Sequence, residues 1–134
     1  MSKRPRVFDS WALMAFLEDE PSAESVEELI AQAHEVEAPL LVTTVNLGEV
    51  WYSLARTRSE ADADMAAAHL VRLGFEVIDA DWELARQAAA FKARFRLAYG
   101  DCFAAALAKL KKTELVTGDR EFKQLESEVK VLWL

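Results

Sequence analysis

The chain has 134 residues, of which 52% are hydrophobic, so it is long enough to form a core without disulfides or structural metals. Its single cysteine, Cys102, excludes an intrachain disulfide and is consistent with a reducing compartment. No apolar run is long enough to span a membrane, because the first one is interrupted by Asp9 and stopped by the acidic residues 18–20. We therefore expect a single domain over residues 1–134, located in the cytoplasm.

The net charge of −7 is unevenly distributed along the chain. Residues 1–67 carry 5 basic and 13 acidic side chains, whereas residues 68–134 carry 11 basic and 10 acidic ones. A metal-dependent nuclease needs an acidic pocket beside a basic surface, but an acidic half is also common in soluble proteins. The charge distribution is therefore compatible with a nucleic-acid partner and does not by itself indicate one.

Short apolar segments alternate with longer segments of helical periodicity. In chain order they predict strand Arg6–Phe8, helix Ser10–Leu17, helix 22–37, strand Leu40–Thr44, helix 46–58, helix 61–72, strand Phe75–Ile78, a helix capped by Asp81, a helix from Asp101 to about Lys111, strand Leu115–Thr117 and strand Val129–Trp133. Strands that alternate with helices in this way are typical of an α/β fold with a parallel sheet.

Four carboxylates occupy comparable places in this pattern. Asp9 follows the first strand, and Glu49 lies in the first turn of the helix after the second strand. Asp101 begins a helix, and Asp119 follows a later strand. The carboxyl ends of parallel strands converge in one crevice, where four carboxylates would repel one another unless cations lay between them. Because Mg²⁺ and Mn²⁺ prefer oxygen ligands, the pattern predicts a site for one of these ions.

Each of these acids also has a purely structural role open to it. Asp9 or Asp101 would cap a helix, and Asp119 would stabilise a turn. The segment NLGE at residues 46–49 matches a capping box, in which Glu49 reaches back to the backbone N–H of Asn46. A cap and a metal ligand are compatible roles, so both interpretations stay open.

Four segments resemble the PIN-domain family, in particular the VapC-type toxins of toxin–antitoxin pairs: VFDS at 7–10, NLGEV at 46–50, YGDCFA at 99–104 and LVTGDREF at 115–122. Their order and spacing fit this family over essentially the whole chain. The resemblance implies a three-layer α/β/α fold with a central, mainly parallel sheet. It also implies an endoribonuclease that depends on Mg²⁺ or Mn²⁺ and cleaves RNA phosphodiester bonds with a metal-activated water.

The resemblance assigns roles to particular residues. It implies that the catalytic and metal-binding residues are Asp9, Glu49, Asp101 and Asp119, with Ser10 and Thr117 as supporting hydroxyl groups. It further implies a homodimer and a cognate antitoxin protein. Arg120 departs from the family pattern, in which an acidic or amide residue often follows the last aspartate, so no fifth acidic ligand is expected at that position.

RNA binding also needs cations, which gather near the predicted ends of two helices. The candidates are Lys92, Arg94, Arg96, Lys109, Lys111 and Lys112. The same residues complement the negative ends of helix dipoles, which is an equally simple reason for their positions.

Other chemistries have weaker support in the sequence. Both histidines, His34 and His69, lie in the middle of predicted helices, and there is no glycine-rich phosphate-binding motif. Cys102 is expected in the core, although a helix N-terminus would lower the pKa of its thiol. The four tryptophans are also expected in the core, with Trp51 and Tyr52 as alternative contacts to a partner.

Two further functions remain as alternatives to the nuclease. A receiver-type phospho-acceptor domain is also a short α/β chain, but it would need an acid pair after the first strand and a suitably placed lysine after the last. The sequence has neither, since Asp9 is a single acid. The other alternative is a PIN-like domain without catalytic activity that serves only as an interaction module.

Overall fold

In the computed structural model, which describes residues 3–134, the strands form one five-stranded sheet. The strands are β1 (Arg6–Phe8), β2 (Leu40–Thr43), β3 (Phe75–Ile78), β4 (Glu114–Thr117) and β5 (Val131–Trp133). Their order is β3-β2-β1-β4-β5, and every neighbouring pair is parallel. The chain runs from β1 to one edge and then returns to the other side of β1. The strand order therefore switches between β1 and β4, which is where open α/β sheets form binding crevices.

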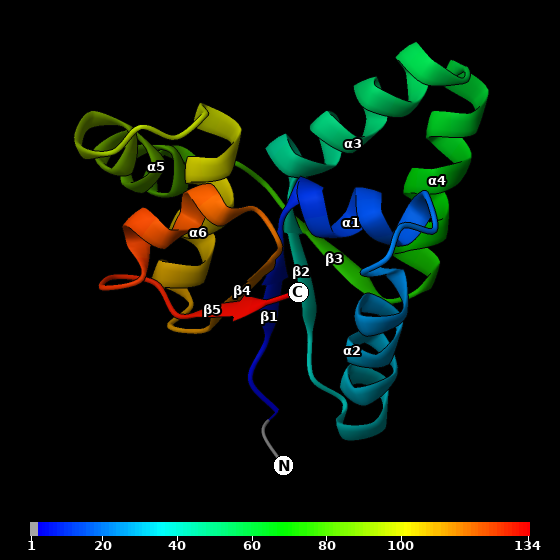
Figure 1. Ribbon diagram of the computed structural model, residues 1–134, viewed down its shortest axis with the longest axis horizontal. Coiled ribbons are helices and arrows are strands. Elements are labelled where there is room, and N and C mark those ends of the chain that lie inside the picture. Colours follow the sequence, from blue (N-terminus) through cyan, green and yellow to red (C-terminus); the bar gives the residue numbers. More distant parts are fainter. Residues whose placement is uncertain (1–2) are drawn as a thin grey trace.

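Helices cover both faces of this sheet (Figure 1). They are α1 (Ser10–Leu17), α2 (Ala23–Val36), α3 (Thr44–Thr57), α4 (Glu60–Arg72), α5 (Trp82–Arg94), α6 (Tyr99–Leu110) and the 3-10 helix η1 (Arg120–Leu125). The first four pack on one face, and α5, α6 and η1 pack on the other. This arrangement confirms the predicted three-layer α/β/α fold. Within residues 3–134, no helix has the length and apolar character needed to cross a membrane.

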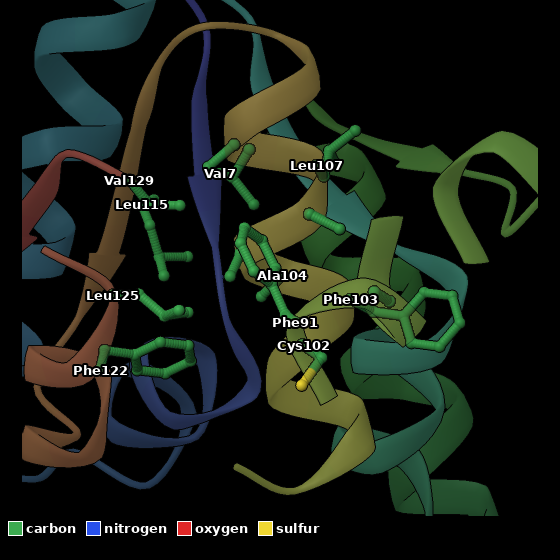
Figure 2. Packing of buried hydrophobic residues seen from close by; sticks show 14 of the residues in the cluster. Val7, Phe91, Cys102, Phe103, Ala104, Leu107, Leu115, Phe122, Leu125 and Val129 are labelled. Carbon is green, nitrogen blue, oxygen red and sulfur yellow. The ribbon is translucent and has the colours of Figure 1, made fainter. Parts of the chain in front are cut away.

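Two hydrophobic cores hold the central strand from both sides. Val7 belongs to the core beneath α5 and α6, whereas Phe8 belongs to the core beneath α1 to α4, because successive strand residues point to opposite faces. Figure 2 shows the first of these cores, in which Phe91 and Phe122 reach toward the sheet from different helices. Both faces of β1 are thus packed, and the position of Asp9 at its carboxyl end is fixed.

The structure corrects two predicted helix starts. Helix α3 begins at Thr44, and the side chain of Thr43 caps it by accepting from the backbone N–H of Asn46 at 3.0 Å. The predicted capping box was therefore wrong, and Glu49 lies in the second turn of α3 rather than the first. Helix α6 begins at Tyr99, so Asp101 lies within the first turn and is not the N-cap.

Candidate active site

Asp9 lies at the carboxyl end of β1, where the strand order switches between β1 and β4, and its side chain is almost completely buried. It caps helix α1, because its Oδ1 accepts from the backbone N–H of Ala12 at 2.8 Å. Its Oδ2 accepts from the hydroxyl of Thr117 at 2.5 Å, and the same Thr117 oxygen accepts from the backbone N–H of Asp119 at 3.0 Å. Thr117, predicted as a supporting residue, thus connects two of the four predicted acids. Ser10, the other predicted supporting residue, is the first residue of α1.

Asp119 also belongs to a cluster of three carboxylates. Asp101, Asp119 and Glu121 each offer an oxygen, and these oxygens lie within 4.8 Å of one another. Asp119 caps η1 by accepting from the backbone N–H of Glu121 at 3.0 Å. Glu121 was not among the predicted site residues, because a fifth acid was expected only at the position directly after Asp119. A helical turn that begins at Asp119 brings the second following residue back to the cluster, and Glu121 takes the place that Arg120 does not fill.

Glu49 approaches the same group of acids from α3. The side-chain amide of Asn46 donates to Glu49 Oε1 at 3.0 Å and to the carbonyl oxygen of Gly100 at 2.9 Å. Asn46 is completely buried, and its own Oδ1 accepts from the hydroxyl of Thr43 at 2.6 Å. This amide therefore joins the start of α3 to the start of α6. Asn46 was predicted as a helix cap, whereas in the structure its side chain holds Glu49 beside Asp101.

The electrostatics link all five acids. The pKa of Asp9 is raised from 3.8 to about 7, with burial as the largest cause. The hydrogen bonds from Thr117 and Ala12 oppose this shift, and the charges of Asp101 and Asp119 add to it. The pKa of Asp101 also rises to about 7. Burial is the largest cause, followed by the charges of Asp119, Glu49 and Glu121.

This concentration of negative charge is the environment that a bound cation would relieve. The donors are all carboxylate oxygens, and at least three of them are close enough to share one ion. Such a donor set fits a hard divalent cation such as Mg²⁺ or Mn²⁺ better than a metal that prefers nitrogen or sulfur ligands. The residues present are therefore suited to the ion that the sequence pattern predicts.

The comparison with protein families identifies the chain. The model of the PIN domain matches residues 6–128. The chain belongs to the PIN-domain family. This membership excludes the receiver-type alternative. A search of curated proteins found no match to the chain.

Solved structures with the same fold accompany this match. This chain is similar to VapBC2 from Rickettsia felis, which was solved bound to a DNA fragment from its promoter. The TM-score is 0.75 at 14% identity, with 97% of this chain and 98% of that chain covered. It is also similar to VapC20 from Mycobacterium tuberculosis, described as a toxin that cleaves the sarcin–ricin loop, with a TM-score of 0.68, 20% identity, and coverage of 90% and 93%. FitAcB from Neisseria gonorrhoeae gives a TM-score of 0.71, 18% identity, and coverage of 95% and 96%. At these identities the likeness establishes the fold.

The predicted RNA-binding cations of the PIN domain lie mostly in contacts within the chain. Arg94 and Lys109 each donate to Glu128 at 2.9 Å and hold the pKa of that carboxyl at about 2. Lys92 donates to the carbonyl oxygen of Leu97 at 2.7 Å. These three side chains are therefore engaged in contacts within the chain.

Two of these cations lie at the end of the sheet where the strands begin. Lys109 and Lys112 line a cavity of about 650 Å³ there, whereas the carboxylates lie where the strands end. Arg96 is held elsewhere, where its backbone N–H donates to Gln124 Oε1 at 3.1 Å. A role in RNA binding for these positions remains a prediction.

Several other residues of the PIN domain differ in their surroundings from what the sequence suggested. Cys102 is completely buried, and this burial raises the pKa of its thiol to about 11, so the idea of a lowered pKa was wrong. Among the tryptophans, Trp11 is 37% exposed and Trp82 is 74% exposed, so the expectation that all four lie in the core was wrong as well.

The histidines of the PIN domain are engaged away from the acids. His34 Nε2 lies 2.5 Å from the carbonyl oxygen of Leu73 and donates to it. The ring of His69 stacks on that of Phe16, with the ring planes at 7°. Neither is placed to act on a phosphate bound at the carboxylates.

A methyl group at Gly100 would disturb the site selectively. A Cβ at this position would lie 2.2 Å from Glu49 Oε2, so Gly100→Ala should displace the Glu49 carboxylate. Because a displacement of about 1 Å can cost about 100-fold in rate, we expect the rate of nucleic-acid cleavage by such a site to fall at least about tenfold. The displaced group is the end of a flexible side chain, so the melting temperature should change little.

Gly48→Ala is the matched control for this substitution. It adds the same methyl group one residue from Glu49, where nothing lies within 4 Å. It should preserve cleavage and stabilise α3 by up to about 1 kcal/mol through helix propensity. Equal rates for Gly100→Ala and Gly48→Ala would show that the position of Glu49 does not matter for cleavage.

Proposed function

We propose that this chain acts as one PIN domain and is a metal-dependent endoribonuclease, the toxin of a toxin–antitoxin pair that works in the cytoplasm. The observation that carries the proposal is the set of carboxylate oxygens from Asp101, Asp119 and Glu121 within 4.8 Å of one another. Asp9 and Glu49 adjoin this set and act on it electrostatically. The similar structures support the same proposal, because they include a toxin–antitoxin complex and a toxin that cleaves the sarcin–ricin loop.

Each of these residues has a distinct task in the proposed reaction. Asp101, Asp119 and Glu121 would hold a divalent cation, and Asp9 would contribute its charge from beneath. When bound, Mg²⁺ or Mn²⁺ supplies a Lewis acid that lowers the pKa of water and offsets charge on the phosphate. Thr117 keeps the Asp9 carboxylate in a fixed orientation, and Asn46 does the same for Glu49. Hydrolysis by water leaves 5′-phosphate and 3′-hydroxyl ends.

The proposed partners follow from the same site. An antitoxin would inhibit by inserting an Arg or Lys side chain among the carboxylates, since a guanidinium can bridge two of them and replace the cation. The toxin itself would be a homodimer. Large apolar side chains that are exposed on the surface, among them Tyr52 and Met65, are available for such contacts.

The proposal is tested by the cleavage of RNA by the purified chain. We expect cleavage with Mg²⁺ or Mn²⁺, none with excess EDTA, and recovery when the metal is restored. Ligation and phosphatase treatment of the products should reveal 5′-phosphate and 3′-hydroxyl ends. Cleavage that persists in EDTA, or that leaves 2′,3′-cyclic phosphates, would contradict the proposed chemistry. An intact RNA pool with every metal tested would favour the non-catalytic alternative.

A further inference from the structure

An exposed indole stands beside the acidic cluster. Trp11 is the second residue of α1 and follows Asp9 by two positions. Its side chain is 37% exposed, although the neighbouring residues Ala12 and Leu13 are completely buried. Trp11 is therefore a large aromatic side chain that presents part of its surface to solvent two residues after Asp9.

The position of this indole is fixed by the loop that carries Asp119. If Gly118 had a Cβ, that atom would lie 2.2 to 2.7 Å from three atoms of the six-membered ring of Trp11. Only the absence of a side chain at Gly118 allows so close an approach. The ring therefore rests on the backbone one residue before Asp119, and it is held near two of the proposed catalytic acids at once.

A cation lies on the other side of the same loop. Arg120, the residue after Asp119, is exposed, and its guanidinium carbon lies 4.8 Å from the centre of the Trp133 ring. Trp133 packs against the core beneath α5 and α6, whereas α1, which carries Trp11, packs on the opposite face of the sheet. Residues 118–120 thus run between an aromatic surface and a guanidinium.

A nuclease with this site must attract RNA despite a strongly negative cluster of carboxylates. The chain has a net charge of −7, and its carboxylates repel phosphates whenever no metal offsets them. Stacking of a base on an aromatic side chain is insensitive to this repulsion and contributes substantially to the binding of single strands. An indole beside the scissile position would supply that contribution where the backbone electrostatics do not.

We propose that Trp11 is a base-stacking residue, which holds an unpaired nucleobase of the RNA next to the phosphate that is cleaved. This assignment rests on the proposed nuclease function and adds to it a residue that contacts the substrate beside the cleaved bond. Arg120 is placed to contact the phosphate backbone on the opposite side of Asp119. Trp11 thereby contributes to the choice of cleavage position.

The binding test separates stacking from catalysis. It uses a fluorescein-labelled single-stranded RNA oligonucleotide with Mg²⁺, and every variant carries Asp101→Asn so that the RNA stays intact. Trp11→Ala should weaken binding about 5-fold to 100-fold, as expected for the loss of one stacked base. Trp11→Phe should retain most of the affinity. Trp82→Ala removes another exposed indole, which follows the edge strand β3, and should change nothing.

Two further measurements distinguish stacking from a structural role. In the otherwise wild-type chain, Trp11→Ala should redistribute the cleavage positions in a pool of RNA sequences while the Mn²⁺-induced rise in melting temperature is unchanged. An affinity within about twofold of the parent, with the same cleavage positions, would overturn the proposal and leave Trp11 as a contact for a protein partner. A simultaneous loss of the Mn²⁺ effect would overturn it too, because Trp11 would then support the acids. If the parent binds RNA and the wild type never cleaves it, the nuclease function fails while the stacking result still stands.

Discussion

Asp101→Asn should reduce the rate of RNA cleavage at least about 100-fold, with the fold unchanged. Asp101 occupies the centre of the acidic cluster, since its pKa responds to the charges of Asp119, Glu49 and Glu121. It also offers one of the three oxygens that lie within 4.8 Å of one another. Asparagine keeps the shape and removes the charge that would hold the cation. The loss should therefore appear in kcat/KM at saturating metal and be larger at low metal concentration.

A graded series tests whether the cluster acts as one site. Asp9→Asn should also lose about 100-fold or more, because it removes the charge beneath the other acids. Glu121→Gln should lose about tenfold or more, since Glu121 is more exposed than Asp101. Asp19→Asn is the matched control, an exposed aspartate with φ of 51° that asparagine adopts readily. Cleavage retained in both Asp9→Asn and Asp101→Asn would remove the basis of the assigned site.

The parts of this site that depend on local signals could be predicted from the sequence. The first strand, its end at Phe8 and the helix from Ser10 to Leu17 match the prediction because Asp9 caps α1 within its own segment. The parallel sheet followed from the alternation of strands and helices. Convergence of the strand ends then placed Asp9 and Asp119 at neighbouring strands.

The remaining parts depend on contacts that no local pattern contains. The contact of Glu49 with Gly100 joins α3 to α6, and the amide of Asn46 that fixes it spans a separation of 54 residues. The predicted start of α3 was two residues too late, because the segment NLGE at 46–49 matches a capping box whereas Thr43 is the actual N-cap. Glu121 entered the site only through the unpredicted turn of η1. Helix propensity and motif spacing do not specify contacts between residues that are distant in the sequence.

The metal-free protein should become less stable as the pH rises from about 4 to about 7. Asp9 titrates near 3.8 in the unfolded chain, whereas burial raises its pKa to about 7 in the folded protein. Between these values the folded state keeps a proton that the unfolded chain has released, so stability falls with increasing pH. Above about pH 7 both states are ionised and the penalty is complete. A shift of this size corresponds to about 4 kcal/mol. Asp101 contributes in the same direction.

Asp9→Asn should remove this penalty and keep the structural role of the side chain. Asparagine caps helices as well as aspartate does, so the hydrogen bond from the backbone of Ala12 should survive. We expect the metal-free variant to melt about 4 °C or more above the wild type near pH 8 and to match it near pH 4, because Asp9 is protonated there. Asp19→Asn should match the wild type at both values. A variant that gains equally at both pH values would contradict the role of ionisation.

Divalent metal should close most of the gap between these melting temperatures at constant ionic strength. A cation that binds only the folded state at 100 times its Kd stabilises it by about 2.7 kcal/mol, which is comparable to the penalty from Asp9. The wild type should therefore gain strongly from Mn²⁺ near pH 8, whereas Asp9→Asn and Asp101→Asn should gain much less. Near pH 5 the gain should shrink in the wild type too, since the ion must displace protons from Asp9 and Asp101. Equal metal-induced rises in melting temperature in all three proteins would mean that these carboxylates do not share an ion. The cluster would then destabilise the fold without binding the metal that the proposed reaction needs.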